Sequence, residues 1–101
     1  MAESAQLRHV AELAEQHGVL FHHCRDSRSC SGNAGLPDVI LVGPGGVLFR
    51  ELKGSGYRSP RQTDWHWMLR AAGADTGLWY PTHERDGVVA QQIAAVARPR
   101  A

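Results

Sequence analysis

Three ionisable side chains stand at the ends of two apolar segments, 35–42 and 47–53. Asp38 lies near the start of the first segment, and Glu51 and Lys53 close the second. A Gly-Pro-Gly-Gly sequence separates the segments, and β-type apolar runs on both sides of such a turn predict a β-hairpin. Pairing the two segments would bring all three charged groups to one end of a sheet.

The residue types indicate what such a cluster could do. Glu51 and Lys53 are two residues apart, so on a strand their side chains project to the same face. Two neighbouring carboxylates repel each other unless a cation lies between them, and hard oxygen ligands suit Mg²⁺ or Mn²⁺. The ammonium of Lys53, the one lysine among eleven basic residues, could orient water or stabilise charge on a phosphate oxygen. These are the parts of a phosphodiester hydrolase, although three ordinary strand-end charges in solvent remain the alternative.

Apolar periodicity predicts the elements that precede the hairpin. Residues 3–17 repeat apolar side chains at helical intervals before Gly18, which indicates an amphipathic helix that ends there. The apolar run 19–23 predicts a strand, and residues 24–36, rich in Ser and Gly without periodicity, predict a loop. We expect these elements to lead the chain into the first strand of the hairpin.

A second helix is predicted over residues 60–72. Proline at its first turn and glycine directly after it are typical helix boundaries. The apolar spacing predicts that Trp65 and Leu69 face the core, whereas Arg61 and Asp64 face solvent. This helix would lie next to the end of the strand that carries Lys53.

The C-terminal part predicts one more strand and a closing helix. Residues 76–80 form an apolar run that Pro81 ends, and apolar positions from Glu84 or Arg85 to Ala97 follow a helical period. The complete order is helix-strand-strand-strand-helix-strand-helix. This order predicts an α/β fold with a mixed central sheet flanked by helices.

Length and composition limit the possible classes. The chain has 101 residues, 43% of them hydrophobic, which suits one domain over residues 1–101 with a modest core. A net charge of +1 argues against a generally basic protein that coats nucleic acid, but it leaves room for a local arginine patch. No apolar run approaches the roughly 20 residues that span a bilayer, and no signal pattern opens the chain, so we expect a cytoplasmic protein.

An ordered set of short motifs resembles the PD-(D/E)XK nuclease superfamily and, within it, the small stand-alone phage-type members of the VRR-NUC (virus-type replication-repair nuclease) branch. The resemblance covers nearly the whole chain. It rests on Glu3, His23, Asp26-Ser27-Arg28, Gly35-Leu36-Pro37-Asp38, Glu51-Leu52-Lys53, Ser59-Pro60-Arg61-Gln62, Trp65, Leu69 to Gly73, and Trp79-Tyr80-Pro81. It implies a restriction-endonuclease-like core and, if the likeness extends to the source, a phage-encoded protein in a bacterial host.

The resemblance also implies a set of site residues. Asp38 and Glu51 would bind one or two Mg²⁺ or Mn²⁺ ions, the backbone carbonyl of Leu52 would be a further ligand, and Glu3 could reach the metal from the first helix. Lys53 would act in catalysis, and Gln62 would support it by orienting a phosphate or a water molecule. The expected DNA contacts are Arg25, Ser27, Arg28, Arg58 and Arg61.

The predicted function is a metal-dependent DNA endonuclease, selective for branched or junction DNA. A domain this small has little area for a branched substrate, so we expect a homodimer, with His66 or Trp67 on a candidate interface. One departure from the family is Arg50, which we expect to face a solvent edge or DNA. One alternative is a non-catalytic DNA-binding or assembly module on the same fold.

A second alternative is a metal-binding regulatory domain. Cys24 and Cys30 lie near His22 and His23, which permits a zinc site, but their spacing matches no standard zinc finger. With only two cysteines and no signal pattern, reduced thiols are the default expectation.

Overall fold

The computed structural model of the chain describes residues 3–23, 31–53 and 60–100. Four helices and four strands occur in these ranges: α1 (Glu3–His17), β1 (Leu20–His23), β2 (Val39–Gly43), β3 (Gly46–Leu52), α2 (Pro60–Ala71), β4 (Asp75–Trp79), α3 (Pro81–Arg85) and α4 (Val88–Val96). The order predicted from the sequence is confirmed, with the short helix α3 as an addition. The closing helix therefore begins at Val88 instead of Glu84 or Arg85, because Gly87 has a left-handed backbone (φ 77°) that interrupts the helical path.

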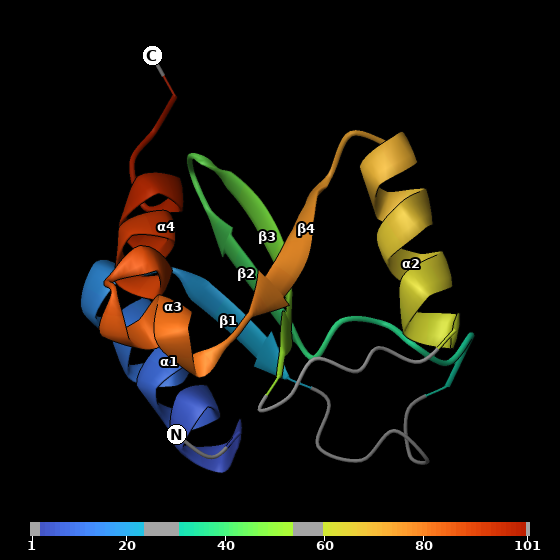
Figure 1. Cartoon of the computed structure of the whole chain (residues 1–101). Helices are drawn as coiled ribbons and strands as arrows, with labels where there is room; N and C mark the ends of the chain where they lie inside the picture. Colours follow the sequence, from blue (N-terminus) through green and yellow to red (C-terminus); the bar gives the residue numbers. More distant parts are fainter. Residues whose placement is uncertain (1–2, 24–30, 54–59, 101) are drawn as a thin grey trace.

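The sheet contains the strands in the order β1-β2-β3-β4. β1 pairs antiparallel with β2, β2 pairs antiparallel with β3, and β3 pairs parallel with β4. Figure 1 shows α1, α3 and α4 on one side of this sheet and α2 alone on the other side. The mixed sheet flanked by helices confirms the predicted fold class.

The apolar core lies between the sheet and the layer of α1 and α4. Its buried side chains come from these helices, from the connection between α1 and β1 and from the inward faces of β2, β3 and β4: Val10, Leu13, Ala14, Val19, Val39, Leu41, Leu48, Leu52, Trp79, Val89, Ile93 and Val96. β3 places Leu48 and Leu52 in this core, as the two-residue period of a strand requires. None of the described helices is long and apolar enough to cross a membrane.

Helix α2 packs differently from the other long helices, since none of its residues is buried. Trp65 and Leu69 are only partly covered, so the prediction that they belong to the core is wrong. The four large apolar residues Trp65, Trp67, Met68 and Leu69 are spread around the helix instead of forming one stripe. Trp67 and Met68 are 68% and 69% exposed. Arg61 and Asp64 face solvent, as predicted.

The hairpin turn between β2 and β3 is anchored to the end of α4. Gly45 donates its N–H to the carbonyl of Val96 at 2.8 Å. A Cβ atom at Gly43 would lie 2.2 Å from the same carbonyl oxygen, so no larger residue fits without a shift of the backbone. This contact holds the end of the hairpin that lies farthest from Asp38 and Lys53.

Candidate active site

The register of the hairpin sets Asp38 against Glu51. Val39 at the start of β2 pairs with Arg50 of β3, so the next pair beyond the strand is Asp38 and Glu51. Two hydrogen bonds close this end: the Asp38 N–H donates to Glu51 Oε1 at 2.9 Å, and the Leu52 N–H donates to Asp38 Oδ2 at 3.0 Å. Each carboxylate is therefore held by the backbone of the opposite chain segment.

Lys53 follows directly after β3 and is held on two sides. Its backbone N–H donates to the carbonyl of Trp79 in β4 at 3.0 Å. Its ammonium donates to Gln62 Oε1 in the first turn of α2 at 3.1 Å. Leu52 between Glu51 and Lys53 points into the core, so the two charged side chains share the α2 side of the sheet. The structure thus brings all four expected catalytic residues to one end of the sheet.

Burial makes the negative charge on Glu51 unfavourable. The residue is only 5% exposed, and its Oε2 atom is buried without a hydrogen-bond partner in the part of the chain that the structure describes. Burial, and then the negative charge of Asp38, raise the pKa of Glu51 from 4.5 to about 7, although the Lys53 ammonium lowers it slightly. A cation bound next to both carboxylates would remove this penalty.

The donor set fits a hard divalent cation. The unpartnered Glu51 Oε2 and the adjacent Asp38 carboxylate supply oxygen atoms, and Asp38 and Lys53 remain partly exposed to solvent. Within residues 3–23, 31–53 and 60–100, there is no group of three or more His, Cys, Asp or Glu residues placed so that it could hold a metal ion. Two carboxylates completed by backbone oxygen and water would suit Mg²⁺, because this ion retains several waters. The geometry of the Glu3 side chain is not described, and Cys24 and Cys30 of the zinc alternative lie outside the described residues.

Gln6 is a residue near the site that the sequence reasoning missed. It is fully buried on α1, and its Nε2 donates to the Trp79 carbonyl at 3.4 Å. The same carbonyl accepts the N–H of Lys53, so Gln6 braces the strand ends beside the site. A signal was present in the sequence, because Gln6 lies four residues before Val10 and thus on the apolar face of the helix.

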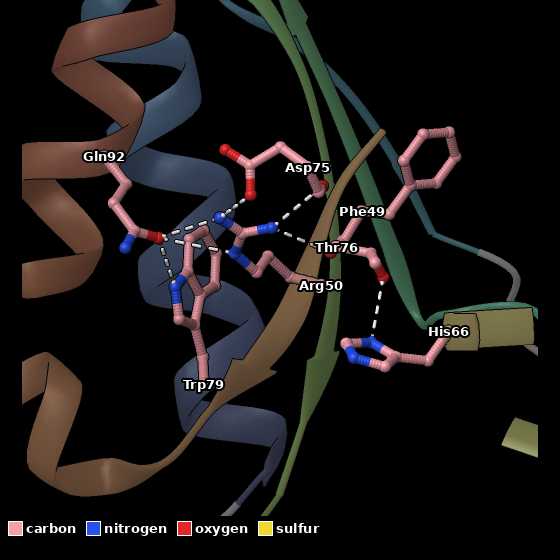
Figure 2. Close-up of polar contacts among 7 residues, drawn as sticks. All are labelled: Phe49, Arg50, His66, Asp75, Thr76, Trp79 and Gln92. Atoms are coloured by element: carbon pink, nitrogen blue, oxygen red, sulfur yellow. Dashed lines mark hydrogen bonds and ion pairs between the residues drawn. The ribbon is translucent and has the colours of Figure 1, made fainter. Parts of the chain in front are cut away.

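Arg50 does not face solvent or DNA, so that prediction is wrong. It is 5% exposed and points toward α4, on the opposite face of the sheet from His66 (Figure 2). Its guanidinium donates to Gln92 Oε1, to the carbonyl and carboxylate of Asp75 and to the carbonyl of Phe49, and it lies 5.4 Å from the ring centroid of Trp79. A buried cation is tolerated here because its donors have acceptors and it stacks on an aromatic ring.

Of the expected DNA contacts, Arg61 is the one in the described part of the chain. It is exposed on the first turn of α2 and borders an open pocket of about 560 Å³ between this helix and residues 32–34. Trp65, Asp64 and Met68 also line the pocket. Arg25, Ser27, Arg28 and Arg58 lie in segments that the structure does not describe.

Comparison with known proteins supports the assignment that the motifs suggested. A solved structure described as a "VRR_NUC domain protein" is similar to this chain with a TM-score of 0.56 and 25% sequence identity, over 75% of this chain and 68% of the other. This similarity supports the assignment of the chain as a VRR-NUC domain. No family model and no curated protein matches the sequence. The mixed sheet and flanking helices of the chain are consistent with the PD-(D/E)XK-like fold of VRR-NUC domains, which suggests a nuclease and implies a divalent metal cofactor in general.

Proposed function

We propose that this VRR-NUC domain is a metal-dependent DNA endonuclease that hydrolyses phosphodiester bonds, with selectivity for branched or junction DNA in replication, repair or recombination. The observation that carries the proposal is the meeting of Asp38, Glu51 and Lys53 at one end of the β2–β3 hairpin. Two carboxylates that can share a cation, next to an amine, are the groups that phosphodiester hydrolysis requires.

The carboxylates of Asp38 and Glu51 would hold Mg²⁺ or Mn²⁺, with the carbonyl of Leu52 as a further ligand and Glu3 as an additional candidate ligand. When bound, such an ion supplies charge neutralisation at the phosphate and lowers the pKa of water. The N–H of Leu52 keeps the Asp38 carboxylate turned toward β3, and the N–H of Asp38 does the same for Glu51. Both carboxylates are therefore oriented before a cation arrives.

Lys53 would stabilise the negative charge that grows on a phosphate oxygen during cleavage. Its ammonium carries three donors, of which one is directed at Gln62 Oε1. Gln62 thus limits the conformations of the Lys53 side chain, which lowers the cost of placing the charge at the reacting group. DNA would approach from the α2 side, with Arg61 as a phosphate contact and Arg25, Ser27, Arg28 and Arg58 as further contacts.

A second copy of the chain is the partner that we propose for the exposed face of α2. Trp67 and Met68 are the apolar side chains on this face, and an exposed tryptophan is a typical interface anchor. Asp64 and Arg70 lie three residues before and after Trp67. An antiparallel pairing of two α2 helices about Trp67 would bring Asp64 of each copy level with the arginine of the other copy, which complements the charges. Sedimentation that gives only monomer at micromolar concentration would exclude this dimer.

The experiment that tests the function compares branched, single-stranded and linear duplex DNA, each incubated with Mg²⁺ or with EDTA. We expect cleavage with Mg²⁺ only, and preferentially of branched DNA. Lys53→Ala should cut at least about 100-fold more slowly, the typical cost of losing one electrostatic contact to a transition state. Arg98→Ala removes an exposed positive charge near the hairpin turn, at the other end of the sheet, and is the matched control.

The outcomes separate the proposal from its alternative. If Lys53→Ala and Asp38→Asn cut DNA at the rate of the unmodified protein, the site assignment is wrong. If the unmodified protein binds DNA but cuts none of the substrates with Mg²⁺ or Mn²⁺, the domain is a non-catalytic DNA-binding module on the same fold.

A further inference from the structure

The segment that leads into Asp38 is fastened to helix α2 at two adjacent points. The indole N–H of Trp65 donates to the carbonyl oxygens of Asn33 at 3.1 Å and Ala34 at 3.0 Å. At the next residue, Gly35, a Cβ atom would lie 2.5 Å from the carbonyl carbon and oxygen of Arg61, and the backbone has a φ of 101°. The backbone of this segment therefore lies directly against the backbone of α2, and only glycine allows that approach.

The fastening spans residues 33–35, three to five residues before Asp38, which itself stands outside the ladder of β2. The sheet fixes the chain from Val39 onward, so the direction of the Asp38 side chain depends also on the segment before it. The same end of α2 holds Lys53 through Gln62. Helix α2 therefore touches both chain segments that carry the candidate catalytic groups.

Polar contacts help to place α2, since none of its residues is fully buried. The bonds from Trp65 and the Lys53–Gln62 bond act at its first half, and His66 Nδ1 lies 3.4 Å from Thr76 Oγ1 of β4 (Figure 2). Asn33 and Ala34 are exposed, so their carbonyls would bond to water if the indole N–H were removed. Losing this donor would thus loosen the segment at little cost in folding free energy.

We propose that Trp65 is a positioning residue for the metal site: its indole N–H holds the segment before Asp38 so that the Asp38 carboxylate faces Glu51. This inference rests on the proposed function, since it concerns how well the two carboxylates share a cation. Partners that orient metal ligands from outside the coordination sphere typically contribute 10–100-fold to metal affinity. The contribution of Trp65 should therefore fall on metal affinity more than on stability.

The test measures Mn²⁺ binding and thermal unfolding of the same variants. Trp65→Phe keeps an aromatic ring and removes the N–H donor. Free Mn²⁺ is followed by electron paramagnetic resonance during a titration without DNA, and melting is recorded without metal. We expect the Mn²⁺ dissociation constant to rise about tenfold while the melting temperature of the metal-free protein stays close to that of the unmodified protein.

Two further variants make the result decisive. Arg100→Met is the matched control, because Arg100 also donates a side-chain N–H to an exposed turn, at the carbonyl of Gly45 on the far end of the sheet. Its Mn²⁺ affinity should be unchanged. Gly35→Ala pushes the same segment away from α2 while the indole N–H stays in place, and it should weaken Mn²⁺ binding at least as much as Trp65→Phe.

The failure of this inference can be told from the failure of the proposed function. If the unmodified protein binds Mn²⁺ and both Trp65→Phe and Gly35→Ala bind it equally well, the positioning role is wrong and the metal site remains. A loss of affinity in Trp65→Phe that merely follows a lowered melting temperature, as a general loosening would produce, also overturns the role. If the unmodified protein binds no Mn²⁺, the proposed function falls and the positioning role falls with it.

Discussion

Replacing Glu51 by glutamine should stabilise the metal-free protein at neutral and alkaline pH. The carboxyl is buried, its pKa is raised from 4.5 to about 7, and the charged form is opposed by Asp38. Because one pKa unit corresponds to about 1.4 kcal/mol, charging Glu51 in the folded protein costs about 3 kcal/mol more than charging it in the unfolded chain. Glutamine removes this charge and retains an oxygen that can accept the Asp38 N–H.

The sign of the pH dependence follows from the raised pKa. Below pH 4.5 the carboxyl is protonated in both states, and the penalty is absent. Between pH 4.5 and about 7 the unfolded chain loses the proton while the folded protein keeps it, so stability falls as the pH rises. Above pH 7 the penalty is complete, and Glu51→Gln should exceed the unmodified protein by about 2 to 3 kcal/mol in the free energy of unfolding.

Urea denaturation with EDTA, followed by tryptophan fluorescence from pH 4 to pH 8.5, measures this difference. Glu12→Gln is the control, because Glu12 is an exposed carboxylate on α1 and its replacement should leave a small difference at every pH. The reasoning is refuted if Glu51→Gln is less stable than the unmodified protein at pH 8, which would mean that Lys53 stabilises the Glu51 anion by more than burial and Asp38 destabilise it. A difference that does not vary with pH would refute it as well.

Three further predictions concern single side chains. Asp38→Asn should weaken Mg²⁺ binding, so the melting temperature of this variant should rise less with added Mg²⁺ than that of the unmodified protein. Arg61→Ala should lower the affinity for all DNA sequences alike and reduce the slope of log K against log salt by about one, which binding titrations at several salt concentrations measure. Arg50→Met should lower the urea-unfolding free energy by about 2 kcal/mol, because the bonds to Asp75 and Gln92 are lost, whereas Arg8→Met at an exposed position should change it by less than about 0.5 kcal/mol.

The hairpin and the order of elements could be predicted from the sequence because the signals are local. The two-residue period of β2 and β3 and the glycine-rich turn between them define a register, and that register sets Asp38 against Glu51. Lys53 lies at the same end of the sheet as Glu51, and its side chain projects to the same face because the two residues are two positions apart on the strand. Each of these relations spans at most the length of the hairpin.

Arg50, Trp65 and Gln6 could not be placed in this way, because their partners are distant in the sequence. Arg50 bonds to residues 25 and 42 positions away, and Trp65 bonds to carbonyls 31 and 32 positions away. Gln6 meets a carbonyl 73 positions away. Periodicity reports which face of an element is apolar, and it carries no information about a polar partner that only the folded chain brings near.

The sequence alone thus determined the succession of helices and strands, the hairpin and the grouping of two acids with one amine, since all of these depend on neighbours along the chain. The packing of the elements decided three other features: the buried guanidinium of Arg50 on the α4 side of the sheet, the partial exposure of α2 and the burial of Glu51. Those features depend on free energies of burial and on bonds between remote segments. They arise only when the helices pack against the sheet.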